Sequence, residues 1–214
     1  MSDCTSCGAA LASSLVCEAC GALQNATDAA DAPWAAFGLE RAYALDGPAL
    51  KKRLLALQRR MHPDFFGGAS AEERELAERN TAELNAAHRV LADDARRADL
   101  LVRALGGPDD QKERQMPQAF LMEVLEWNET LEEARDASLE EGSPTRAALD
   151  SLETQLVSER REALERIAGL LTPLPDAGAP ALTNARKELN AVRYLDRTLS
   201  TLRELRLDAA RSTR

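Results

Sequence analysis

Apolar side chains recur at helical spacing in the first half of the chain. One stripe, with intervals of four, three and four residues, consists of Leu50, Leu54, Leu57 and Met61. This spacing predicts the buried face of a helix, which ends where Pro63 forbids its continuation. A second helix is expected over Ala71 to Leu91, with Ser70 as its N-cap. The two helices should form a hairpin.

The second half of the chain predicts three more helices. After a shorter helix beyond Arg96, the sequence Gly106, Gly107, Pro108 indicates a helix stop and a domain boundary. Breaks at 142–144 and 173–180 separate three apolar stripes. The stripes are Phe120, Val124, Trp127 and Leu131; Leu149, Leu152, Leu156, Leu164, Ile167 and Leu170; and Leu189, Val192, Leu195, Leu199 and Leu202. Residues 108–214 are therefore expected to form a three-helix bundle.

Composition agrees with an all-α fold and narrows the partners. Aromatic residues make up only 4% of the chain, while Ala, Leu, Glu and Arg are abundant, as in helices packed through aliphatic stripes. The net charge of −9 disfavours nucleic acid and anionic membranes as partners. No apolar run reaches membrane-spanning length, and the N-terminus resembles neither a signal nor a transit peptide, so we expect a cytoplasmic protein.

All the cysteines lie within the first twenty residues. They form two CxxC pairs, each followed by a glycine: Cys4 and Cys7 before Gly8, and Cys17 and Cys20 before Gly21. Such hooks can bring four thiolates to one tetrahedral centre, so residues 1–24 are predicted to be a structural zinc module, followed by a polar linker at 25–32. A rubredoxin-like iron site, a redox dithiol pair and two disulfides are the alternatives.

A short polar motif lies in the predicted hairpin loop: His62, Pro63 and Asp64. The helix before it carries five basic residues with no acid between them, namely Lys51, Lys52, Arg53, Arg59 and Arg60. Pro63 stiffens the loop and pushes His62 out of the helical region, which presents Asp64 at a defined place. A partner with an acidic groove would fit. From these residues alone, a helix stop beside a solvated basic face is the better interpretation.

The segment from Trp34 to Phe66 resembles the J-domain of the HscB family, through Phe37-Gly38-Leu39, Tyr43-Ala44-Leu45-Asp46 and the sequence LQRRMHPD. The likeness continues through Leu84-Asn85-Ala86 and Arg97-Ala98. It implies a J-domain at 33–107 whose His-Pro-Asp loop and basic helix dock on a DnaK-type chaperone such as HscA and accelerate its ATP hydrolysis. The protein would then be no enzyme itself. Phe65 departs from the lysine that many J-domains have after the Asp, which puts partner affinity in doubt.

The segment from Phe120 to Glu133 also resembles HscB proteins. The resemblance implies a surface for the iron-sulfur scaffold protein IscU, made by Leu121, Met122, Leu125, Glu126 and Glu129, with Tyr194 as the matching aromatic of the last helix. Helical geometry turns the first three away from the buried stripe, and Tyr194 lies off its own stripe and is expected to be exposed. A wider core face is the alternative that the residues alone leave open.

The function expected is that of a co-chaperone, which stimulates a DnaK/HscA-type ATPase and delivers an IscU-type scaffold in iron-sulfur cluster assembly. Some HscB proteins, including the human type, carry a similar four-cysteine module. A J-domain protein with another client is one alternative. The other is a zinc-ribbon regulator or nucleic-acid adaptor, which is disfavoured because residues 1–21 contain no Lys, Arg or aromatic residue.

Overall fold

The computed structural model describes residues 3–26, 28–66, 68–135, 140 and 142–212. Within these ranges the regular structure is helical and no strand occurs, apart from two isolated bridges near the N-terminus, so the all-α prediction is confirmed. The chain divides into two compact units, residues 1–100 and 101–214. The dividing point lies inside a helix, a few residues before the boundary expected from Gly106, Gly107 and Pro108.

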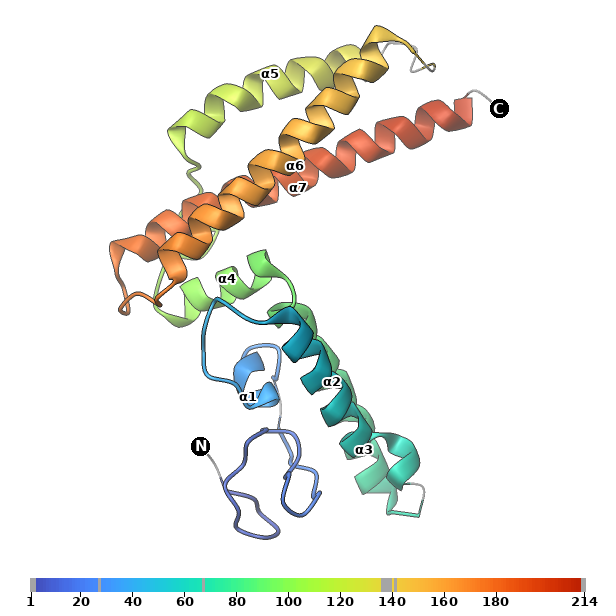
Figure 1. Ribbon diagram of the computed structural model, residues 1–214, viewed down its shortest axis with the longest axis vertical. Helices are drawn as coiled ribbons and strands as arrows, with labels where there is room; N and C mark the ends of the chain where they lie inside the picture. The colour runs from blue at the N-terminus through green and yellow to red at the C-terminus, as the bar shows by residue number, and fades with distance from the viewer. Residues whose placement is uncertain (1–2, 27, 67, 136–139, 141, 213–214) are drawn as a thin grey trace. The chain divides into compact units, whose positions relative to one another are not determined.

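The first unit contains the expected hairpin (Figure 1). Its elements are α1 (Pro33–Phe37), α2 (Gly47–Met61), the short 3-10 helix η1 (Pro63–Phe66), α3 (Ala71–Leu91) and the first part of α4 (Asp94–Ala104). The bounds of α3 are those predicted, because Ser70 and Glu73 form a reciprocal capping box at its start. Leu50, Leu57 and Met61 are buried, as their spacing predicts, and Leu54 is half-buried.

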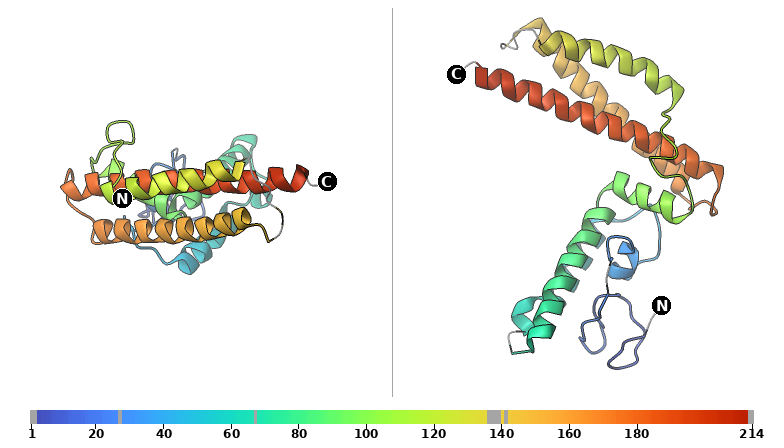
Figure 2. Two further views of the ribbon diagram at one scale, coloured as in Figure 1. Left: turned by 90° about the horizontal axis from the view of Figure 1, so that it is seen from above. Right: turned by 180° about the vertical axis from the view of Figure 1, so that it is seen from behind.

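The second unit is the expected three-helix bundle of α5 (Gln118–Arg135), α6 (Pro144–Leu171) and α7 (Pro180–Ser212) (Figure 2). Phe120, Trp127 and Leu131 of α5 are buried in its core. The stripe predicted for α6 drifts in its second half: Leu164 and Leu170 are only half-buried. Their neighbours Ala163 and Leu171 are buried instead. The predicted stripe contains a step of eight residues, from Leu156 to Leu164, which turns it by about 80° around a helix of 3.6 residues per turn, whereas a step of seven residues leads to Ala163 on the same face.

None of the helices in the described part of the chain combines the length and apolar character needed to cross a bilayer.

Candidate functional site

The four cysteine sulfurs gather at one point. All of them lie within 4.8 Å of one another, and both the Cys4–Cys20 and the Cys7–Cys17 sulfur pairs are 3.7 Å apart. Thiolates bound at about 2.3 Å in a tetrahedron would be separated by about 3.8 Å. A disulfide needs a separation of about 2 Å, and all four cysteines are free. The cluster therefore fits a tetrahedral metal ion and not two disulfides.

Two matching turns build this cluster. The amide of Gly8 donates to the carbonyl of Cys4, and the amide of Gly21 donates to the carbonyl of Cys17; both hydrogen bonds are 2.9 Å long. Both glycines have positive φ, +74° and +78°, a conformation that side chains disfavour. The Ser6 amide also points to the Cys4 sulfur at 3.4 Å. Each CxxC-Gly sequence thus folds back so that its two sulfurs face those of the other turn.

The pKa values of Cys4 and Cys7 are shifted in opposite directions. Hydrogen bonds from the backbone amides of Cys7 and Ser6 lower the pKa of Cys4 to about 6. At Cys7 the Ala9 amide acts in the same direction, but hydrogen bonding with Cys20, burial and the remaining sulfurs prevail and raise the pKa to about 12. The backbone amides around Cys4 thus favour its thiolate, whereas the surroundings of Cys7 favour its thiol. A bound cation would stabilise both thiolates at once.

The four-cysteine module (residues 1–24) is attached to the helical hairpin by a buried amide. Asn80 of α3 is fully buried, and its Nδ2 donates to the carbonyls of Leu15 and Gln24, both at 2.8 Å. Leu15 and Val16 are also fully buried. The buried residues of the module thus lie next to the hairpin at Asn80.

Glu18 connects the module to the basic helix. This connection was not predicted from the sequence. The carboxylate of Glu18 forms an ion pair with Arg53 of α2, and its backbone carbonyl accepts a hydrogen bond of 3.0 Å from Nη1 of Arg60. Hydrogen bonding to Arg53 lowers the pKa of the Glu18 carboxyl. Nε of Arg53 also donates to the carbonyl of Phe37 at 2.9 Å. No local pattern could have found this pair, because its members are 35 residues apart.

The basic face of α2 (Lys51, Lys52, Arg53, Arg59 and Arg60) is therefore divided into two rows. Arg53 and Arg60, seven residues apart and hence on one side of the helix, both contact Glu18. Lys52 and Arg59 form the adjacent row and are exposed, as is Lys51. The whole face is predicted to bind a partner. In this structure Arg53 is half-buried against the module, and the other four residues are exposed.

The His-Pro-Asp loop follows directly. His62 ends α2 in an extended conformation, with φ of −62° and ψ of 129°, as expected before a proline. Its Nδ1 accepts a hydrogen bond of 3.3 Å from the Asp64 amide and lies 3.5 Å from the Asp64 carboxylate. That carboxylate is 88% exposed. Pro63 belongs to η1, but its side chain and that of Phe65 lie outside the described part of the structure.

On α5, three large apolar side chains face solvent. The exposed fractions are 44% for Leu121, 70% for Met122 and 62% for Leu125. Glu126 and Glu129 are also exposed. The wider core face is therefore not the explanation of these residues. We refer to Leu121, Met122 and Leu125 as the α5 strip.

Tyr194 of α7 lies differently from the expectation. It is half-buried, because its ring packs edge-on against Phe120 with centroids 5.8 Å apart. The hydroxyl donates a hydrogen bond of 3.1 Å to Oδ1 of Asn128 on α5. Tyr194 therefore holds α5 against α7, and only part of its ring remains accessible.

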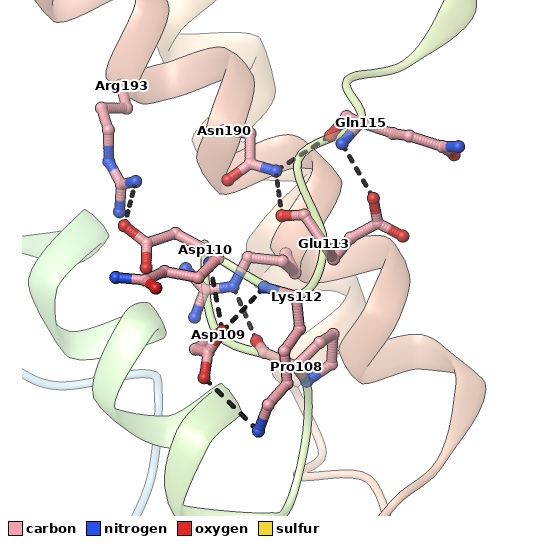
Figure 3. Close-up of polar contacts among 10 residues, drawn as sticks. Pro108, Asp109, Asp110, Lys112, Glu113, Gln115, Asn190 and Arg193 are labelled. Carbon is pink, nitrogen blue, oxygen red and sulfur yellow. Dashed lines mark hydrogen bonds and ion pairs between the residues drawn. The ribbon is translucent and has the colours of Figure 1, made fainter.

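The segment before α5 is tied to α7 (Figure 3). Nδ2 of Asn190 donates to the carbonyls of Glu113 and Gln115, both at 2.9 Å. Arg193 forms an ion pair of 2.6 Å with Asp110. These contacts fix the backbone that leads into α5, and so they define where the α5 strip begins.

An acidic rim, made by Glu123, Glu126, Glu159 and Glu162, borders the α5 strip. Glu123 was not predicted from the sequence. The pKa of Glu123 is raised, first by partial burial and then by the carboxylates of Glu159, Glu126 and Glu162. Arg166 opposes this shift only weakly, since it is engaged with Glu159 and Glu188. Negative charge thus accumulates where α5 meets α6, which favours a partner with basic groups beside its apolar ones.

Comparison with known proteins gives consistent results. Residues 116–203 match the family model described as the HSCB C-terminal oligomerisation domain. The chain is 37% identical over 145 residues to the co-chaperone protein HscB homolog of Ralstonia nicotianae, covering 67% of this chain and 78% of that protein. It is 35% identical over 153 residues to the homolog of Bordetella petrii, covering 71% and 85%.

Solved structures of similar fold point the same way. Chaperone HscB from Vibrio cholerae has a TM-score of 0.62 and 27% identity, over 81% of this chain and 96% of that one. Human co-chaperone protein HscB has a TM-score of 0.72 over 97% of this chain and 100% of that one. At 23% identity, the human protein is evidence for the fold alone.

Proposed function

Because the chain belongs to the HscB co-chaperone family, we propose that it stimulates the ATPase of a DnaK/HscA-type chaperone and delivers an IscU-type scaffold to it during iron-sulfur cluster assembly. The observation that carries the chaperone half is the exposed Asp64 carboxylate at the end of a basic helix. The two surfaces lie in different units, so each can be altered separately.

The chaperone half works by binding and not by chemistry on this chain. The basic face of α2 (Lys51, Lys52, Arg53, Arg59 and Arg60) would pair with an acidic groove, while Asp64 would pair with a cationic group of the partner. Contacts that are stronger in the hydrolysis-competent state of the chaperone shift its conformational equilibrium toward that state. His62 supports the loop, since its Nδ1 accepts a hydrogen bond from the Asp64 amide.

The test replaces Asp64 by Asn, which keeps the size of the side chain and removes its charge. We expect Asp64→Asn to abolish stimulation of the cognate chaperone's ATPase in single-turnover assays, without change in the affinity for the scaffold. Asp93→Asn is a control with the same chemistry in the same unit, on a residue outside the loop. Normal stimulation by Asp64→Asn would overturn the proposal.

The scaffold half uses the α5 strip with its acidic rim. Burial of Met122 and Leu125 in a complex would contribute roughly 1–2 kcal/mol each. We therefore expect Leu125→Ala to weaken binding of an IscU-type scaffold about five- to thirtyfold, while the circular dichroism and the ATPase stimulation without scaffold stay unchanged. Val157→Ala, which truncates an exposed apolar residue of α6, is the control. Equal affinity of Leu125→Ala and the unaltered chain would favour a different client.

For the cysteine cluster we propose structural zinc, held by Cys4, Cys7, Cys17 and Cys20. The sulfur separations and the closed set of four thiolates support it. Zinc and iron bind at similar distances, so metal analysis of the purified protein decides between them. Stoichiometric iron with a visible charge-transfer band would contradict zinc. We also retain, as a proposal, the four-part organisation at 1–24, 25–32, 33–107 and 108–214.

A further inference from the structure

The contacts of Glu18 bear on what the four-cysteine module does. Glu18 lies between the two ligands of the second hook, directly after Cys17, so its position depends on the fold of the cluster. Its carboxylate and its backbone carbonyl engage Arg53 and Arg60, which are two of the five cations of the basic face. The module thus places an acidic group where an acidic partner would otherwise dock.

We propose that the four-cysteine module is an intramolecular ligand of the basic face of α2, and that metal binding, by ordering the module, keeps Arg53 and Arg60 engaged. The consequence for the chaperone rests on the proposed function: the chaperone competes with Glu18 for these two arginines. A loaded module therefore weakens docking, and its loosening strengthens docking.

The attachment of the module is firm enough for such competition to be selective. The Asn80 hydrogen bonds hold the module on α3, independently of its contact with α2. Oγ of Ser13 donates to the carbonyl of Ala36 at 2.6 Å, which adds an attachment at α1. The module can therefore lose its contact with α2 while two other attachments remain. Release of Arg53 does not require the module to leave the hairpin.

The charges agree with this arrangement. The Arg53 and Glu18 side chains are 27% and 32% exposed, so their pair is neither fully solvated nor inaccessible. A partner carboxylate can replace that of Glu18 without a change of the α2 backbone, because Nε of Arg53 stays on the carbonyl of Phe37. The guanidinium is thereby preoriented toward whichever carboxylate it meets.

The first arm of the test measures affinity for the cognate ATP-bound chaperone, using the full chain loaded with zinc. Glu18→Gln removes the competing charge and leaves all four cysteines in place. We expect it to bind the chaperone roughly three- to tenfold more tightly than the unaltered chain. Glu75→Gln, which neutralises an exposed acid on α3, is the matched control and should bind as the unaltered chain does. Unchanged or weaker binding by Glu18→Gln overturns the proposal.

The second arm needs no chaperone. Transfer of zinc from the protein to a chromogenic chelator is timed for Glu18→Gln, Arg53→Gln and the double variant. We expect each single change to accelerate transfer about two- to fivefold, and the double change to add little, because both remove the same pair. Equal transfer rates in all four proteins overturn the proposal. If no chaperone binds the unaltered chain, the proposed function fails, and this arm still decides whether the module is a ligand of α2.

Discussion

Replacing Asn80 by Ala should weaken the attachment of the four-cysteine module to the hairpin and lower the free energy of unfolding. The side chain is fully buried and makes two hydrogen bonds of 2.8 Å to the carbonyls of Leu15 and Gln24. Each bond is worth about 1 kcal/mol net, and both carbonyls keep a backbone donor, since the Gln24 amide donates to Leu15 and the Ala26 amide donates to Gln24. We therefore expect the free energy of unfolding of the first unit to fall by about 2 kcal/mol.

The assay is urea unfolding of the zinc-loaded chain, followed by tryptophan fluorescence. A Trp127→Phe background leaves Trp34 as the only tryptophan, so the signal reports on the first unit. Trp34 is buried, with its indole nitrogen donating to the carbonyl of Ala42 at 3.1 Å. Its emission should shift when the unit opens.

A second asparagine on α3 supplies the control. Asn85 is half-buried and accepts one hydrogen bond of 2.9 Å, from Gln58. Asn85→Ala should cost only about 1 kcal/mol. If Asn80→Ala costs no more than Asn85→Ala, the two carbonyls of the module are not held as the structure indicates, and the reasoning is refuted.

Three further predictions concern other contacts. Burial, with Asp94 nearby, raises the pKa of Tyr43 to about 12 against the effect of Arg97, so this phenol contributes stability below about pH 10 that is lost as the pH rises toward 12. Ultraviolet titration of the Tyr194→Phe variant, in which Tyr43 is the remaining tyrosine, measures this pKa, and ionisation near pH 10 would contradict the prediction. Tyr194→Phe itself should cost no more than about 1 kcal/mol in thermal unfolding, since only the exposed bond to Asn128 is lost; a larger cost would mean that the ring contact depends on the hydroxyl. Gly38→Ala should destabilise the first unit by at least about 2 kcal/mol in the same urea assay, because φ is +66° and a Cβ would lie 2.3 Å from the carbonyl oxygen of Ala12. Gly47→Ala is the control and should be tolerated, because the space around Gly47 is open.

Much of the fold could be predicted because it depends on local sequence. The apolar spacing predicts the hairpin and the bundle, and the Ser70 cap predicts the start of α3. The cysteine spacing predicts the cluster, because a CxxC-Gly turn needs only a few neighbouring residues. On α6 the apolar Leu164 misleads the prediction, because the seven-residue interval from Leu156 leads to the small Ala163.

What escaped prediction depends on contacts between distant segments. Asn80 lies within the helix predicted over Ala71 to Leu91, but the sequence does not reveal its two acceptors, which lie in the module. Arg53 has the sequence environment of a solvated docking residue, and only the tertiary structure brings Glu18 to it. Tyr194 lies off the core stripe of its helix, yet Phe120 and Asn128 cover part of it from the neighbouring helix.

The attachment of the four-cysteine module at Asn80 also predicts a pattern of evolutionary covariation. A buried amide at position 80 is favourable only while Leu15 and Gln24 offer their carbonyls to it. In a lineage that lost the cysteines, the same asparagine would be an unpaired polar group, and selection should replace it by an apolar residue or expose it to water. Asparagine at this position and the four cysteines should therefore be gained and lost together, and a sequence that has one without the other identifies a protein in which the module is held differently.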